Sequence, residues 1–151
     1  MILPALAWSA PPILTTEGYG AVRFGMPIAA AEKAMGQRTR YPRHGNDCQY
    51  VRFRKYPGIY FMVENGVVVR ADTAKNLRNS AGVRMGMDIA TFKAEHPQYE
   101  IEVQDIDGSS VMYLLKSPDQ HAALVLFAVD GKVLDMWAGI APAYTYDEGC
   151  E

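Results

Sequence analysis

The sequence predicts an α+β fold made of two tandem repeats, each a short helix followed by an antiparallel β-meander. Two similar nine-residue segments, two matching turn signals and the strand-length apolar runs around them support this prediction. We expect the repeats to join into one sheet with the helices packed on one face. The chain has 151 residues, 49% of them hydrophobic and 21% charged, which is the size and balance of one globular domain.

Two similar segments mark the start of each predicted helix. Residues 21–29 (AVRFGMPIA) match residues 82–90 (GVRMGMDIA) at six positions, 61 residues later. In both, the glycine after the extended Val-Arg stretch lets the chain turn sharply into a helix. Pro27 favours the first helical position of one helix, and Asp88 favours a side-chain cap on the other. The predicted helices are 27–35 and 88–96.

A second similarity predicts a β-hairpin in each repeat. Residues 61–68 (FMVENGVV) resemble residues 126–133 (LFAVDGKV). Asn-Gly and Asp-Gly between apolar runs are strong hairpin signals, because the tight turn needs positive φ at two residues. The predicted strands are 48–54, 58–64 and 67–73 in repeat one, and 98–104, 109–116, 122–129 and 132–138 in repeat two.

The chain therefore divides into an N-terminal segment and one domain. Residues 1–12 are apolar and uncharged, which fits either a signal-peptide remnant or an N-terminal strand. No run reaches 18 apolar residues, so we expect no membrane span. The domain, 13–151, consists of repeat one (about 18–79), repeat two (about 80–139) and a C-terminal tail, 140–151.

The two cysteines bear on the compartment. Cys48 lies in repeat one and Cys150 in the polar tail. They are either a disulfide that anchors the tail or two free thiols, and we favour the disulfide. A disulfide favours an oxidising compartment, so we expect a periplasmic or secreted protein.

Charge is unevenly distributed along the chain. Residues 1–82 contain eleven Lys/Arg and five Asp/Glu, whereas residues 83–151 contain four and twelve, for a net charge of −2. This polarity suits attraction between the halves or head-to-tail association with a partner, although two solvated faces of opposite sign are the simpler interpretation. Basic and aromatic residues alternate within 38–56, as in single-strand nucleic-acid binders, but the acidic balance and expected export argue against nucleic acid. The basic residues are densest at Arg38, Arg40, Arg43, Arg52, Arg54 and Lys55.

No motif indicates catalysis or a cofactor. His44 and Asp47 precede Cys48 in a Gly/Asn-rich loop, but a catalytic Cys–His pair is usually assembled from distant segments. The three histidines lack metal-ligand spacing, and the turn at Asp107 lacks the later ligands of a calcium loop. We expect a non-enzymatic protein without a metal or cofactor.

The strand pattern predicts a candidate binding face. Alternation places Tyr50, Arg52 and Arg54 on one side of their strand. Large, stiff aromatic and guanidinium side chains are favoured in protein contact surfaces. In the alternative interpretation, Trp137 lies under residues 140–146 and the charged pairs only solvate the sheet. The candidate binding residues are Tyr50, Arg52, Arg54, Tyr60, Arg70, Asp135 and Trp137.

The two Gly-Met helix starts and the two hairpins resemble the β-lactamase-inhibitor-protein-like fold, in which a short helix and a meander are repeated. A single Phe-Gly-Met helix start is similar to that of the small outer-membrane assembly lipoproteins of the SmpA/OmlA type. The resemblance covers residues 20–138 as architecture. Cys48 and Cys150 depart from the bridge within each repeat of the inhibitor proteins, and the lipobox cysteine is lacking, so no family residue is carried over.

These observations predict an exported protein-binding module, inhibitor-like or an envelope accessory factor, that is a monomer or weak homo-oligomer. The alternative is a small-ligand or carbohydrate-binding protein, or a hydrolase, with its site between the repeats. A pocket there with converging histidine or carboxylate groups favours the alternative. A gently concave sheet favours the protein-binding module.

Overall fold

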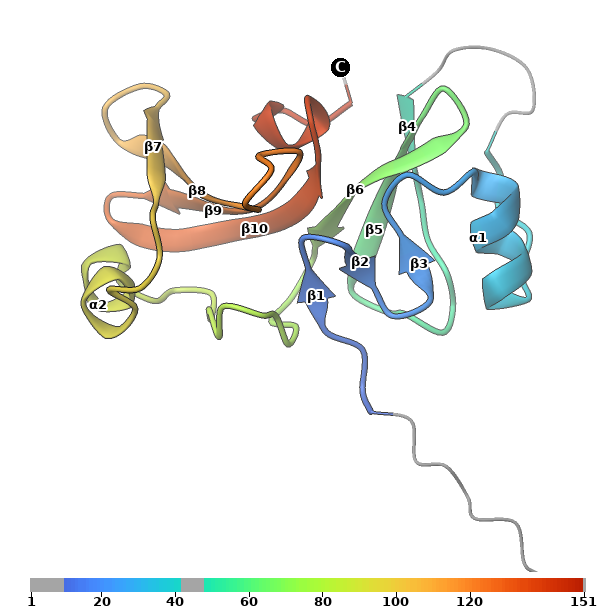
Figure 1. The fold of residues 1–151 in the computed structure, drawn as a ribbon, viewed down its shortest axis with the longest axis horizontal. Coiled ribbons are helices and arrows are strands. Elements are labelled where there is room, and N and C mark those ends of the chain that lie inside the picture. The colour runs from blue at the N-terminus through green and yellow to red at the C-terminus, as the bar shows by residue number, and fades with distance from the viewer. Residues whose placement is uncertain (1–9, 42–47, 151) are drawn as a thin grey trace, which may run out of the picture.

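The computed structural model describes residues 10–41 and 48–150, and it confirms the α+β class. Seven strands form one antiparallel sheet in the order β4-β5-β6-β10-β9-β8-β7 (Figure 1). None of the helices in the described residues is long and apolar enough to cross a membrane. The sheet consists of β4 (Cys48–Val51), β5 (Ile59–Glu64), β6 (Val67–Thr73), β7 (Glu102–Asp105), β8 (Ser110–Lys116), β9 (Ala122–Val129) and β10 (Lys132–Ile140).

Two helices and a small second sheet complete the fold. The helices are α1 (Ile28–Met35) and α2 (Ile89–Glu95), each within one or two residues of the predicted bounds. A short 3-10 helix, η1 (Ala143–Thr145), lies in the C-terminal tail. The second sheet contains β1 (Leu14–Thr15), β2 (Gly18–Tyr19) and β3 (Val22–Arg23). The sequence did not predict these strands, because two residues are too few to show a period.

The helix starts are held by the hairpin turns that follow them in the chain. In each case the backbone before the helix forms hydrogen bonds with the turn and the following strand. Gly25 and Gly86 have φ of 93° and 83° with no atom near a built Cβ, so the backbone conformation alone demands glycine. The hydrogen bonds are Gly25 N–Val68 O and Gly86 N–Val133 O at 2.7 Å, Ile28 N–Gly66 O at 2.8 Å and Ile89 N–Gly131 O at 2.9 Å.

The predicted side-chain cap at Asp88 is wrong. Asp88 is at the N-cap position of α2, but its side chain forms no capping hydrogen bond. Its Oδ1 atom instead lies 3.1 Å from Nζ of Lys132 in an exposed ion pair. The Asp88 carboxylate therefore pairs with a hairpin residue that is distant in the sequence. An exposed ion pair of this kind contributes little to stability.

Both hairpin turns have the predicted backbone. Asn65 and Gly66 have φ of 53° and 77°, and Asp130 and Gly131 have φ of 49° and 78°. Positive φ at both central residues is the signature of the type I′ turn that Asn-Gly and Asp-Gly favour. Local chemistry thus fixes both hairpins.

The sheet has a separate core on each face. The larger core contains the buried residues of α1, α2 and the small sheet, packed on one face. In Figure 1, η1 lies on the other side of the sheet, between β4–β6 and β7–β10. The residues of η1 and the sheet there form a small second core of Met112, Leu114, Ala123, Val125, Trp137 and Tyr144.

The glycine requirement gives a test of the fold. We expect Gly25→Ala and Gly86→Ala each to lower the free energy of unfolding by about 1–2 kcal/mol, because an L side chain is strained at positive φ. Urea unfolding of each variant measures the effect. Thr91→Ala, on the exposed side of α2, serves as a control and should change stability by less than about 0.5 kcal/mol. Unchanged stability of both glycine variants would contradict the described helix starts.

Candidate functional site

The register of the sheet brings most of the predicted binding residues onto one face. In β5, β6 and β10, Tyr60 pairs with Asp72, and Asp72 pairs with Trp137. In the neighbouring row, Tyr50 pairs with Met62, and Met62 pairs with Arg70. Directly paired residues of antiparallel strands point to the same side. These side chains therefore lie on the face that carries η1, which we call the tail face.

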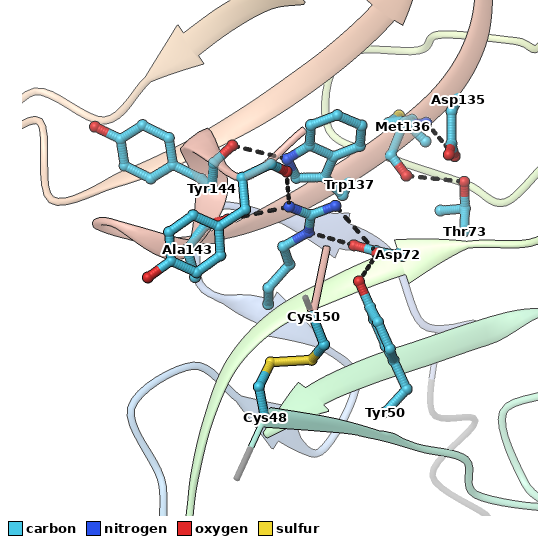
Figure 2. A network of polar contacts seen from close by, with 12 residues as sticks. Cys48, Tyr50, Asp72, Thr73, Asp135, Met136, Trp137, Ala143, Tyr144 and Cys150 are labelled. Atoms are coloured by element: carbon cyan, nitrogen blue, oxygen red, sulfur yellow. Dashed lines mark hydrogen bonds and ion pairs between the residues drawn. A yellow bond between two sulfur atoms is a disulfide. The ribbon is translucent and has the colours of Figure 1, made fainter. Parts of the chain in front are cut away.

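Arg70 is at the centre of the tail face and is only 2% exposed. Its Nε atom lies 2.5 Å from Oδ1 of Asp72, and Nη2 donates to Oδ2 of the same carboxylate at 3.1 Å (Figure 2). Its Nη1 atom donates to the carbonyl oxygens of Ala143, at 3.1 Å, and Tyr146. The guanidinium carbon lies 4.1 Å from the centre of the Trp137 ring. A buried charge is costly unless it is paired and hydrogen-bonded, and here both conditions are met.

Trp137 is buried beneath the tail, with 2% of its surface exposed. Its indole Nε1–H donates to the carbonyl oxygen of Tyr144 at 2.8 Å. The Tyr144 side chain is itself buried, and its hydroxyl donates to the carbonyl oxygen of Gln120 at 3.1 Å. The structure thus places Trp137 and Arg70 inside the protein, where the face hypothesis expected exposed contact residues. The alternative interpretation, with Trp137 under residues 140–146, matches the structure.

The expected disulfide between Cys48 and Cys150 is present. It joins the first residue of the edge strand β4 to the end of the tail, across 102 residues of sequence. In the chain-entropy model a bridge of this span contributes about 4–5 kcal/mol to stability. Next to it, a Cβ built on Gly149 would lie 2.5 Å from the Tyr50 hydroxyl, so only glycine fits there. The tail is therefore held at its far end as well as at Arg70.

Tyr50 links the buried residues to the surface. Its hydroxyl donates to Oδ2 of Asp72 at 2.5 Å, while 38% of the residue is exposed. Burial, followed by the charge of Asp72 and this hydrogen bond, raises the pKa of Tyr50 well above its usual range. The hydroxyl therefore stays protonated to a higher pH than that of an ordinary tyrosine, and its hydrogen bond to Asp72 holds the ring in one position at the rim of the tail face.

The remaining candidates lie around this rim. The guanidinium carbon of Arg52 lies 4.9 Å from the ring centre of Tyr60. Arg52 and Arg54 are exposed, and Tyr60 is partly exposed. Asp135 is partly buried near Asp72, and burial is the main cause that raises its pKa. We call the four accessible residues Tyr50, Arg52, Arg54 and Tyr60 the β4 rim.

The list of candidate binding residues omitted residues that complete the tail face. Asp72 and Tyr144 complete the hydrogen bonds of Arg70 and Trp137. Gly139 pairs with Arg70, and a Cβ on this glycine would lie 2.6 Å from the carbonyl oxygen of Val69. A glycine in a central strand was the available signal, because it marks a close backbone approach.

Metal ligation has little support in the described residues. Within 10–41 and 48–150, no three His, Cys, Asp or Glu side chains gather as a metal site would require. Arg43, His44, Asp47 and residues 1–9 of the N-terminal segment lie outside the described residues. Cys48 is bonded to Cys150 and is therefore not a free nucleophile.

The buried Arg70–Asp72 pair gives a testable prediction. We expect Arg70→Ala to lower the free energy of unfolding by about 3–5 kcal/mol, because it leaves the Asp72 carboxylate without its partner. Asp72→Asn in the same chain should recover part of this loss, which a double-mutant cycle in urea measures. Arg23→Ala breaks the exposed pair with Glu17 and should cost less than about 1 kcal/mol. Equal losses for Arg70→Ala and Arg23→Ala would contradict the burial of the guanidinium.

Opening the disulfide should loosen the tail. In a Trp8→Phe background, we expect Cys48→Ser/Cys150→Ser to shift the emission of Trp137 to longer wavelength, because water reaches the indole. The same variant should unfold at a lower urea concentration, because its free energy of unfolding falls by up to about 4–5 kcal/mol. Reductant should reproduce the shift in the parent protein and have no effect on the double serine variant. Unchanged emission and stability would show that the bridge does not hold the tail.

Comparisons with known proteins complete the description of the site. No protein-family model, curated protein or solved structure matches the chain. The resemblance to the inhibitor-protein-like and SmpA/OmlA-type groups therefore rests on the sequence motifs alone. Function is consequently argued from the geometry of the site.

Proposed function

We propose that this protein is a non-enzymatic protein-binding module that contacts its partner through the β4 rim. One observation carries the proposal: Tyr50, at the rim, is held in place before any partner arrives. The Tyr50 hydroxyl is bonded to Asp72, which is bonded to the buried Arg70. Side chains that are already ordered lose little entropy on binding, so their contacts translate more fully into affinity.

The chemistry of the rim supports a protein as the partner. Tyrosine and arginine are the residue types most often found to dominate binding energy in protein interfaces. Arg52 stacked over Tyr60 forms a broad, amphipathic contact area. Arg70 and Trp137 are buried beneath the tail, and in this proposal they position the residues of the rim.

A tandem duplication is part of the same proposal. Equivalent hydrogen bonds at the two helix starts and equivalent type I′ turns support the proposal that residues 20–73 and 81–138 are one unit repeated. In this proposal the last strands of the two units, β6 and β10, join the units into one sheet. Such a sheet provides a broad surface without requiring a catalytic pocket.

The compartment follows from the disulfide. The Cys48–Cys150 bridge favours an oxidising environment, so we propose a periplasmic or secreted protein. There it would act as an inhibitor or an envelope accessory factor. We propose that it is a monomer or a weak homo-oligomer in the absence of its partner.

A small-ligand site is the second candidate. A depression of about 680 Å³ lies between residues 16–24 and the loop before β9, and Asp119 and His121 are among its lining residues. The Asp119 carboxylate already accepts hydrogen bonds from Ser117 and from the backbone of His121. The carboxylate of Glu17 is paired with Arg23 at 2.6 Å. The depression thus has the histidine and carboxylate groups that favour the alternative, but its carboxylates have protein partners, whereas the ring and guanidinium groups of the β4 rim stay accessible, so it is the second candidate.

Paired substitutions test the β4 rim. We expect the Arg52→Ala/Tyr60→Ala variant to capture at least about tenfold less of a cross-linked partner from envelope extract. Substitutions at contact residues that dominate binding cause losses of this size. Lys93→Ala/Tyr113→Ala is the matched control, because it removes a similar cation–aromatic pair, at 4.8 Å, between α2 and β8. Circular dichroism and urea unfolding verify that both variants fold.

The outcome of this comparison is decisive. Loss of the partner in the rim variant and retention in the control support the proposal. Unchanged capture by the rim variant would contradict it. Loss of binding to a sugar or metabolite library after substitution of His121, with the rim unaffected, would favour the second candidate.

A further inference from the structure

We infer that the partner presents an acidic protein surface, which docks on a basic surface that includes part of the β4 rim. This inference rests on the proposed function and specifies the chemistry of the partner. The basic surface comes from two segments, the end of α1 with the residues after it and the residues after β4. It consists of Lys33, Arg38, Arg40, Arg52, Arg54 and Lys55.

The side chain of Gln37 joins the two segments. Its Oε1 atom accepts the backbone N–H of Arg54 at 2.8 Å, and its Nε2 atom donates to the carbonyl oxygen of Arg52 at 3.4 Å. Lys33 and Arg38 line the same depression of about 340 Å³ beside Gln37. These contacts bring together on the surface cations that are up to 22 residues apart in the sequence.

The six cations are exposed, and one of them, Arg52, stacks on the Tyr60 ring. Within residues 10–41 and 48–150, none of them takes part in an ion pair. The cations that do form ion pairs, Arg23, Arg70, Lys116 and Lys132, lie elsewhere in the described chain.

One carboxylate, that of Glu32, belongs to a residue lining the depression with Lys33 and Arg38, and the sequence that supplies the other cations is poor in acidic residues. Between residues 33 and 63 the sequence contains seven Lys/Arg and one Asp or Glu, Asp47. Glu32 of α1 is buried, and its carboxylate accepts the backbone N–H of Thr39 at 2.7 Å. A cluster of like charge costs repulsion in the free protein and steers an oppositely charged partner toward it. The surface is therefore suited to an anionic partner.

The residue types favour carboxylates on a protein over nucleic acid. Four of the six cations are arginine, whose planar guanidinium matches a carboxylate through two parallel hydrogen bonds. Single-stranded nucleic acid needs aromatic faces on which its bases stack. Arg52 covers one face of Tyr60, and the Tyr50 hydroxyl is bonded to a carboxylate that repels phosphate.

Charge reversal tests this inference. The probes are a synthetic glutamate-rich peptide, a heparin fragment and a single-stranded oligonucleotide, compared at equal charge and about 0.15 M salt. We expect the peptide to bind the intact protein and Arg52→Glu/Arg54→Glu to weaken it about tenfold or more. The control, Arg78→Glu/Arg84→Glu, changes the net charge equally at two exposed arginines outside the basic surface. It should change affinity less than about twofold.

Three results would overturn the inference. No binding of the peptide would exclude an acidic partner. Equal weakening in both variants would show that overall charge, not this surface, attracts the peptide. Tighter binding of heparin or the oligonucleotide than of the peptide would indicate a polyanion in place of a protein.

The two proposals fail separately. If the partner captured from envelope extract depends on Arg52 and Tyr60 while the peptide does not bind, the protein-binding function stands and the acidic partner is excluded. If the peptide binds the basic surface while no partner capture depends on the rim, the acidic docking chemistry stands and the proposed function fails.

Discussion

The buried guanidinium of Arg70 is the constraint on which the tail face depends. A charge that is 2% exposed must be compensated inside the protein, because its lost hydration costs several kcal/mol. Asp72 supplies the opposite charge, the carbonyls of Ala143 and Tyr146 accept two further hydrogen bonds, and Trp137 supplies an aromatic face. The tail can therefore leave the sheet only by exposing both this charge and the small second core.

This arrangement decides which part of the sheet is available to a partner. The tail occupies the centre of the face, where a concave sheet would otherwise offer its deepest contact area. Contact is left to the rim, where Tyr50 and Arg52 remain accessible. Asp72 forms hydrogen bonds with Arg70, which holds the tail, and with Tyr50 at the rim. Stability and the proposed binding function therefore depend on the same contacts. In the proposed function, the basic surface, which shares Arg52 and Arg54 with the rim, adds long-range attraction to this contact.

The sequence predicted the parts of the fold that local chemistry determines. Asn65-Gly66 and Asp130-Gly131 specify their turns through backbone preference, and the glycines before α1 and α2 specify the helix starts. The tail could not be predicted in this way, because its position depends on contacts between Arg70 and residues 73 to 76 positions later. The candidate list grouped Trp137 with Tyr60, and the register puts both on one face, but alternation carries no information about what covers that face. Asp88 shows the same limit, because its carboxylate pairs with Lys132 of the distant hairpin and forms no cap.

Hydrogen exchange of the Trp137 indole N–H, followed by NMR in the intact protein, tests the closed tail face most directly. This proton is buried and donated to the carbonyl oxygen of Tyr144, so it should exchange only when the tail opens, far more slowly than a free indole. Exchange at the rate of a solvent-exposed indole would contradict the closed tail and the role assigned to Arg70.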